Sequence, residues 1–350
     1  MAKKFERLIV HVGMHKTGST TLQHMLHQMK WGPVGPIDMI DVNHSPACML
    51  WFGSALKQER TMLNLGHNRA SAERHLADVQ TRVERQLKSS HKRELVISSE
   101  WLSAGRIMGE GRRGVLKRLK ATFEPHFDKI EFFAYVRPPL AFTTSAAQEM
   151  IKMRREFNTP WANYEQRFGQ IQYLFGRKNV HLRLYDRSKL KNGDVVSDFQ
   201  DWMGWPQRPA KLPHVNQSLS APAAALIHCF QFNRPLTQTV EDHEFKIKSV
   251  EQLAKIPGPK FALSQDLTAQ LLEKNAADLE WIEDCMQQKV SDADRGIPEG
   301  AIAVSGEDDL KYQAARFAPI LRGKAPVEPP DDPEEANAIA WAALQKHLKI

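Results

Sequence analysis

The sequence predicts an α/β protein in which a central, mostly parallel sheet is flanked by helices, followed by a helical C-terminal part. Short apolar runs alternate with longer stretches of helical periodicity, and strand-like runs stop after about residue 210. At 350 residues and 42% hydrophobic content, the chain is long enough to bury a full core.

Four apolar runs predict the strands of the sheet. They are residues 8–12 (LIVHV), 94–98 (ELVIS), 130–136 (IEFFAYV) and 179–185 (NVHLRLY). A fifth strand is expected at 37–42 (IDMIDV), where Gly and Pro residues directly before it weaken the signal.

Apolar residues at helical spacing predict crossover helices between the strands and further helices after them. The expected helices are marked by Leu22, Met25, Leu26 and Met29 and by the ranges 67–90, 138–156, 160–175, 221–233, 264–288 and 334–349. Joints rich in Pro and Gly separate the last ones. We therefore expect an α/β core over residues 1–220 and a helical extension over residues 221–350, packed on that core.

Composition limits the partners and the compartment. The net charge of +7 favours anionic partners, but 48 basic against 41 acidic residues is a bias rather than a polybasic tract, so we expect no nucleic-acid partner. The three cysteines contain no CxxC pair, which predicts neither a disulfide framework nor a cysteine zinc site. The first apolar run is too short for a signal peptide or a membrane span, and a cytoplasmic location is expected.

The segment LIVHVGMHKTGSTTLQHML places a glycine-bearing loop between a predicted strand and an amphipathic helix. This is the context that a phosphate-binding loop needs, because backbone N–H groups at the helix start point at the anion. Gly18 permits close approach, hydroxyl groups supply donors, and Lys16 brings a mobile positive charge. The residues expected to bind phosphate are Lys16, Thr17, Gly18, Ser19, Thr20 and Thr21.

The loop is not a standard Walker A loop, because Ser19 follows Gly18 and Lys16 comes two residues before that glycine. With its lysine before Thr-Gly-Ser-Thr, it resembles the 5'-phosphosulfate loop of sulfotransferases that use 3'-phosphoadenosine 5'-phosphosulfate (PAPS), and GMHKTGSTTLQ is similar to the bacterial branch of that superfamily. The resemblance spans roughly residues 5–220. It implies a P-loop-type three-layer sandwich, PAPS as co-substrate, adenosine 3',5'-bisphosphate (PAP) as product and no metal.

A second phosphate site is expected at the end of another strand, since PAPS carries a 3'-phosphate. Arg137 follows the run IEFFAYV, and Ser145 comes eight residues later. An arginine can fork two phosphate oxygens while a serine adds a donor, and this spacing resembles the 3'-phosphate motif of the family. By the same resemblance, Tyr185 lies where a tyrosine contacts the adenine, and VNQSLS with Asn216 and Ser218 resembles a loop of bacterial members.

Sulfuryl transfer also needs a group that takes the proton of the acceptor. The strand ELVIS runs into Glu100, and strand ends in such a sheet converge on the ligand crevice, so Glu100 is the candidate base. His15 is the second candidate. No motif typical of a metal site occurs, so no structural or catalytic metal is expected.

Basic residues gather between Arg106 and Lys120, with one acid, Glu110, among them, and again at Lys152, Arg154 and Arg155. Such faces attract sulfated, carboxylated or phosphorylated acceptors, although solvated helix faces also produce such runs. The acceptor expected from the family is a carbohydrate or a small metabolite.

Two other functions remain open at this point. A P-loop kinase for a small hydroxylated substrate would share the sheet and the loop, but the displaced lysine and the absence of a Walker B aspartate after ELVIS speak against it. A non-catalytic protein that binds nucleotides or polyanions would retain the same fold.

Overall fold

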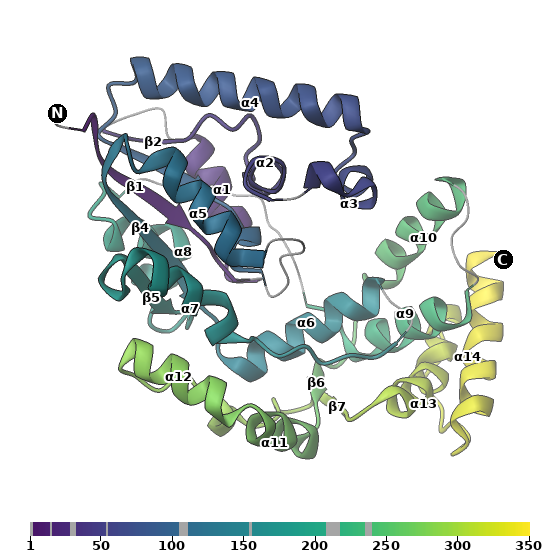
Figure 1. Ribbon diagram of the computed structural model, residues 1–350. Coiled ribbons are helices and arrows are strands. Elements are labelled where there is room, and N and C mark those ends of the chain that lie inside the picture. The colour runs from purple at the N-terminus through teal and green to yellow at the C-terminus, as the bar shows by residue number, and fades with distance from the viewer. Residues whose placement is uncertain are drawn as a thin grey trace. The chain divides into compact units, whose positions relative to one another are not determined.

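A computed structural model describes residues 3–14, 16–28, 33–53, 55–104, 111–153, 156–207, 218–234 and 240–350 (Figure 1). The chain forms two compact units, each built from several segments. The first comprises Met1–Pro138, Asn163–Val215 and Ala277–Val290, and the second comprises Pro139–Ala162, Asn216–Ala276 and Ser291–Ile350. Compactness and catalytic function are different properties, and the expected boundary of the catalytic core at residue 220 stays a prediction.

The first unit contains a five-stranded sheet with the order β2-β3-β1-β4-β5. Its strands are β1 (Phe5–His11), β2 (Val34–Pro36), β3 (Glu94–Ser98), β4 (Phe127–Val136) and β5 (Val180–Leu184). All neighbouring strands are parallel. The α/β fold class with a central parallel sheet, expected from the alternating pattern, is confirmed.

Parallel pairing brings the carboxyl ends of the strands to one edge of the sheet. His11, the last residue of β1, is in register with Ser98 of β3 and with Phe133 of β4. The chain segments that leave β1, β3, β4 and β5 therefore start along the same edge, where ligands bind in open α/β sheets.

Helices cover both faces of this sheet. The helices of the first unit are α1 (Ser19–Gln28), α2 (Ser45–Trp51), α3 (Glu59–Asn64), α4 (Arg69–Ser89), α5 (Gly111–Phe123), α7 (Tyr164–Phe175), α8 (Val195–Trp202) and α12 (Ala276–Met286). α1 packs against α8, and α5 packs against α7 on the other face (Figure 1). The three layers expected from the sequence are thus present.

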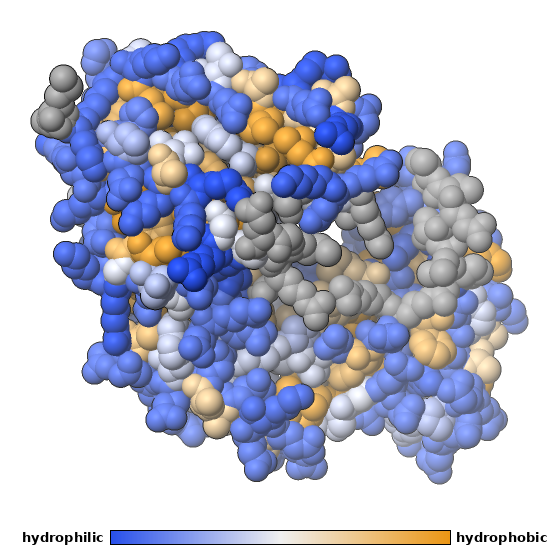
Figure 2. Space-filling view, in the orientation of Figure 1, coloured by the Kyte–Doolittle hydropathy of each residue, from blue (hydrophilic) through white to orange (hydrophobic). Residues whose placement is uncertain are grey.

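The long helix α4 is apolar on one side only. Asn68 begins it by accepting a hydrogen bond from the N–H of Ser71. Its buried residues, Ala72, Val79, Val83 and Leu87, recur at helical spacing. Its outer side is hydrophilic (Figure 2).

The second unit is mainly helical. It contains α6 (Pro139–Met153), α9 (Ala221–Asn233), α10 (Val240–Leu253), α11 (Gln265–Lys274), α13 (Glu307–Phe317), α14 (Pro333–Leu348), β6 (Phe261–Leu263) and β7 (Ile302–Val304). Ala221–Gln231 of α9 are all buried, and α6, α13 and α14 pack around them. The run of alanines lets neighbouring helices approach closely.

Three details differ from the sequence-based expectations. The fifth strand is β2, at Val34–Pro36 rather than 37–42, because Ile40 has a left-handed backbone (φ 72°) that an extended strand cannot contain. Strands do occur after residue 210, since β6 pairs with β7, but three residues each are too few for a periodic signal. The helix expected at 264–288 is two helices, because Asn275 ends α11 and its amide binds the Leu271 carbonyl.

None of the helices in the described ranges is both long and apolar enough to cross a membrane.

Candidate functional site

The loop between β1 and α1 has the backbone of an anion cradle. Lys16 and Gly18, on either side of Thr17, both have left-handed conformations (φ 63° and 82°). A lysine rarely adopts positive φ, so the surrounding structure holds it there at a cost. Turns that alternate in hand aim successive backbone N–H groups into one concavity, which binds anions. This loop also leads directly into α1, whose N-terminus favours negative charge.

Gly13 lies so close to Ser19 that no side chain fits at its position. A Cβ atom on Gly13 would lie 2.3 Å from the Ser19 hydroxyl, so only glycine fits there. The Ser19 hydroxyl is buried and has no hydrogen-bond partner within the described residues. A buried hydroxyl normally has a partner, and an anion held at the start of α1 would supply one.

The other hydroxyl groups of the loop differ in their surroundings. Thr17 is buried and donates a hydrogen bond to the Met14 carbonyl at 2.7 Å, so its hydroxyl closes the loop rather than facing a ligand. Thr20 is exposed and Thr21 is partly exposed at the start of α1. Of the hydroxyl donors expected from the sequence, Ser19, Thr20 and Thr21 stay candidates for binding phosphate.

The strand that leads into the phosphate loop ends in a buried polar side chain, His11. The His11 ring binds the Ser98 hydroxyl at 2.8 Å, and the N–H of Ser98 donates to Nδ1 of His44 at 3.2 Å. Burial lowers the pKa of His11 to about 4, so its ring is neutral at neutral pH. On the next segment, Ser103 donates to the Val12 carbonyl at 2.7 Å.

The structure brings Arg137 to the phosphate loop. Arg137 follows β4 directly, and its guanidinium donates to the carbonyl of Lys16 at 3.3 Å. Its backbone N–H approaches the Met14 sulfur at 3.4 Å, and its carbonyl accepts a hydrogen bond from the Tyr164 hydroxyl at 2.7 Å. Two cationic side chains expected to bind different phosphates therefore stand at one edge of the sheet.

Ser145, the expected partner of Arg137, lies in α6 and belongs to the second unit. A 3'-phosphate site formed jointly by Arg137 and Ser145 stays a prediction. Asn216 and the candidate base His15 lie outside the described residues.

Tyr185 lies directly after β5, at the same edge as Arg137. Its N–H donates to the Val136 carbonyl at 2.8 Å, and its ring meets that of Tyr135 edge to face at 6.0 Å. Below it, the buried carboxylate of Asp198 accepts hydrogen bonds from Tyr135 at 2.6 Å and from Arg183 at 2.5 and 2.6 Å. The ring is partly exposed, so a planar nucleobase has room to stack against it.

Glu100 begins a short 3-10 helix, η2 (Glu100–Ser103), that follows β3. Ser103, at the other end of this helix, binds both the Glu100 carbonyl at 3.2 Å and the start of the phosphate loop. The carboxylate is partly exposed and helps to raise the pKa of Arg167, which burial otherwise lowers. Glu100 thus lies at the expected edge, close enough to a buried arginine to affect its ionisation.

Sequence reasoning missed a pair of buried arginines near this edge, Arg112 on α5 and Arg167 on α7. Arg112 belongs to the basic run that was expected to form a solvated or steering face. Arg118 and Lys120 of the same run donate to the Phe52 and Leu174 carbonyls, and Arg113 and Lys117 are exposed. The signal that could have found Arg112 is helical periodicity, because Arg112 shares one face of α5 with the apolar residues Val115, Leu116, Leu119 and Phe123, whereas Arg113 lies off that face.

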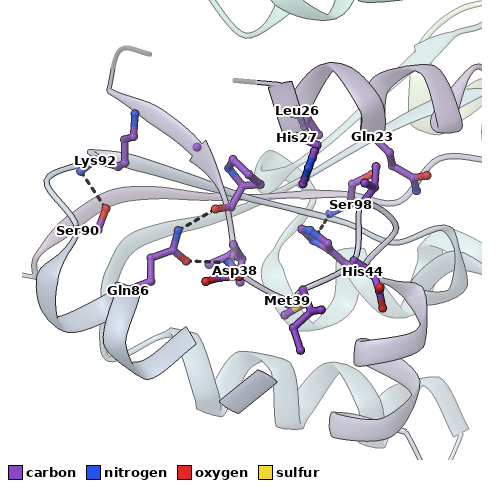
Figure 3. A pocket seen from close by; sticks show the side chains of 16 residues that line it. Gln23, Leu26, His27, Asp38, Met39, His44, Gln86, Ser90, Lys92 and Ser98 are labelled. Atoms are coloured by element: carbon purple, nitrogen blue, oxygen red, sulfur yellow. Dashed lines mark hydrogen bonds between the residues drawn. The ribbon is translucent and has the colours of Figure 1, made fainter. Parts of the chain in front are cut away.

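A cavity of about 350 Å³ lies beside β2 (Figure 3). Gln23 and Leu26 of α1, Met39, His44 and Ser98 line it together with eleven other residues. Gln86 spans one side by binding the Pro36 carbonyl and the N–H of Asp38. None of the residues expected to bind nucleotide lines this cavity, so loop geometry, rather than the cavity, defines the candidate phosphate site.

Within the described ranges, no three His, Cys, Asp or Glu side chains gather in a way that could hold a metal ion.

No model of a known protein family matches the chain. No curated protein matches it either. Among solved structures, the chain is similar to the crystal structure of a sulfotransferase from Alicyclobacillus acidocaldarius, with 13% identity and a TM-score of 0.39, over 80% of this chain and 96% of that chain. A likeness this distant does not establish a function for this chain.

Proposed function

We propose that this protein is a sulfotransferase that moves the sulfuryl group of PAPS to a hydroxyl or amine of an acceptor, a carbohydrate or small metabolite, and releases PAP. The observation that carries the proposal is the contact between Arg137 and the phosphate loop through the Lys16 carbonyl. It places a second cationic side chain beside a loop whose own lysine precedes the glycine. A nucleotide with two separate phosphate groups fits such a pair of cations.

The residues present fit PAPS. The backbone of the loop, Lys16 and the unpartnered Ser19 hydroxyl would hold the 5'-phosphosulfate, with Thr20 and Thr21 as further donors. Arg137 would hold the 3'-phosphate. The partly exposed ring of Tyr185 would lie against the adenine.

PAPS supplies the sulfuryl group and, in PAP, the leaving group. Glu100 takes the proton from the acceptor hydroxyl as the new S–O bond forms. The old S–O bond breaks and its electron pair stays on the phosphate oxygen, where the ammonium of Lys16 stabilises the charge. The transfer thus needs one base and one mobile cation from this chain.

A P-loop kinase is the nearest competing function, and nucleotide selectivity separates the two. Isothermal titration calorimetry should show that the protein binds PAP far better than ATP or ADP, because neither has a 3'-phosphate for Arg137. Arg137→Ala should weaken PAP binding at least about tenfold, since a lost charged hydrogen bond costs on the order of 2 kcal/mol. Arg85→Ala, at an exposed arginine of α4, should leave PAP affinity unchanged.

Equal affinities for PAP and ATP, or binding that requires Mg²⁺, would contradict the sulfotransferase assignment and favour a kinase. A protein that binds PAP but never forms it from PAPS, across a panel of hydroxyl and amine acceptors followed by mass spectrometry, would instead be a non-catalytic binder.

A further inference from the structure

Two arginines are buried close together in the first unit. Arg112 is the second residue of α5 and is 8% exposed, and Arg167 on α7 is 5% exposed. The two helices pack against each other on one face of the sheet (Figure 1). Arginine is almost never buried to this extent unless a carboxylate or another anion compensates its charge.

The described residues do not supply that compensation to Arg112. Its Nη2 group donates to the Ala104 carbonyl, which is neutral. Its Nε group is buried and has no hydrogen-bond partner within the described part of the chain, and no ion pair joins Arg112 to a described carboxylate. A guanidinium at the N-terminus of a helix also faces the positive end of the helix dipole, and the first turn of α5 contains no acidic residue.

The second arginine lies close enough to Arg112 for its charge to act on it. Arg167 donates to the Ser103 carbonyl at 3.0 Å. The pKa of each guanidinium group is lowered to about 10, mainly by burial and, for Arg112, also by the charge of Arg167. Tyr164, Asp278 and Glu100 act in the opposite direction on Arg167. Both side chains are charged at neutral pH.

The position of the pair relates it to the proposed reaction. Ser103 and Ala104, whose carbonyls the arginines bind, follow β3 at the carboxyl edge of the sheet, three and four residues after Glu100. The Ser103 hydroxyl donates to Val12 at the start of the phosphate loop. The two arginines thus hold the segment that connects Glu100, the candidate base, with the start of the phosphate loop.

We propose that Arg112 and Arg167 bind an anionic group of the acceptor, so that the preferred acceptor carries a carboxylate, sulfate or phosphate besides the group that is sulfated. This inference rests on the proposed function, because the loop and Arg137 already account for the two phosphates of PAP. The Nε group of Arg112, which has no partner among the residues that the structure describes, is the donor that such an anion would satisfy.

Inorganic sulfate is the probe, added to protein saturated with PAP so that both phosphate sites are occupied. The thermal midpoint of the wild-type protein should rise with sulfate concentration. In Arg112→Gln and Arg167→Gln the apparent sulfate affinity should fall at least tenfold, while PAP affinity changes less than twofold. Arg113→Gln, at the exposed neighbouring arginine, should behave like the wild-type protein.

Stability without sulfate separates binding from a structural role. Because Arg112→Gln removes a buried charge that lacks a counter-charge within the described ranges, its midpoint in sulfate-free buffer should equal or exceed that of the wild-type protein. A lower midpoint together with an undiminished response to sulfate would show a structural role and overturn the proposal.

The remaining outcomes are also decisive. A tenfold loss of PAP affinity in Arg112→Gln would mean that the pair holds the nucleotide, and the assignment to the acceptor would fall. If the wild-type protein does not bind PAP, the proposed function fails separately. Sulfate is then titrated against the protein alone, and a response equal in wild-type and Arg112→Gln protein would reject the anion site itself.

Discussion

At the scale of single residues, burial separates side chains that are chemically alike. Arg112 and Arg113 are neighbours on α5, yet one is buried and the other exposed. Glu100 is partly exposed, and its charge acts on the buried Arg167. Each of these groups owes its chemistry to what surrounds it, since the free energy of a charge depends on access to water and on neighbouring charges.

Replacement of Glu100 by glutamine tests the candidate base. The amide keeps nearly the same shape and can still bind the acceptor, but it cannot take a proton, so turnover should fall by roughly 10²-fold or more. PAP affinity should barely change. The measurement is the initial rate of PAP formation from PAPS together with a PAP titration.

Glu124→Gln is the matched control, because Glu124 is an exposed carboxylate just after α5. Full turnover in Glu100→Gln across acidic to neutral pH would mean that another group takes the proton, and His15 would be the next residue to replace.

At the scale of elements, β1, the phosphate loop and α1 pack so tightly that two glycine positions leave no room for a side chain. Gly13 leaves no space for a side chain beside Ser19, and a Cβ on Gly18 would approach Val195 of α8 to 2.9 Å. Lys16 keeps a left-handed backbone within this segment. Packing within the chain therefore sets the shape of the cradle, which reduces the ordering cost of binding an anion.

A double-mutant cycle at Gly13 tests this packing. Gly13→Ala should lower the free energy of unfolding by about 1–3 kcal/mol, as overpacking does, and should weaken PAP binding. The added methyl group would meet the Ser19 hydroxyl, so in a Ser19→Ala background the cost of Gly13→Ala should shrink by at least about 1 kcal/mol. Urea unfolding of the four proteins measures the cost of Gly13→Ala with and without the Ser19 hydroxyl.

Gly35→Ala serves as the control, because a Cβ there meets only the flexible Lys92 side chain at 3.5 Å or more. If Gly13→Ala costs the same with and without the Ser19 hydroxyl, the contact between these two residues does not close the loop.

At the scale of the whole molecule, buried histidines link the stability of the sheet to pH. Burial lowers the pKa of His11 and of His44 to about 4 each, and the charge of His27 adds to the effect on His44. In the unfolded chain both rings take up protons near pH 6.5. Between pH 6.5 and about 4 the unfolded chain binds more protons than the folded one, so stability is complete above pH 6.5 and is lost as pH falls through this window.

Each buried histidine should cost about 2 kcal/mol of stability at pH 5 relative to pH 7. His44→Asn keeps an acceptor for the N–H of Ser98 but does not titrate. Between pH 7 and pH 5 the stability of this variant should therefore fall by about 2 kcal/mol less than that of the wild-type protein. Amide hydrogen exchange in β1 and β3, corrected for intrinsic rates, measures the opening free energy of this sheet. The exposed His91, changed to Asn, should leave the pH dependence as in the wild-type protein. An undiminished fall in His44→Asn would show that other groups set this dependence.

The sequence by itself determined the alternation of strands and helices, because hydrophobic periodicity records which faces are buried. Four of the five strands of the main sheet and the helices α1, α4, α6, α7, α9 and α14 lie close to where their patterns predict them. The loop with Lys16 and Gly18, and the positions of Glu100, Arg137 and Tyr185 after strands, were also evident, because parallel strands share one edge.

Only the tertiary structure decided which charged side chains are buried. Periodicity puts Arg112 and Arg167 on the apolar faces of α5 and α7, but only the packing of these two helices buries both guanidinium groups. The same holds for the Ser19 hydroxyl, which is buried and has no hydrogen-bond partner in the part of the chain that the structure describes. Periodicity identifies the face that a helix buries, but the free energy of a charge or hydroxyl depends on groups distant in sequence, which only the fold brings together.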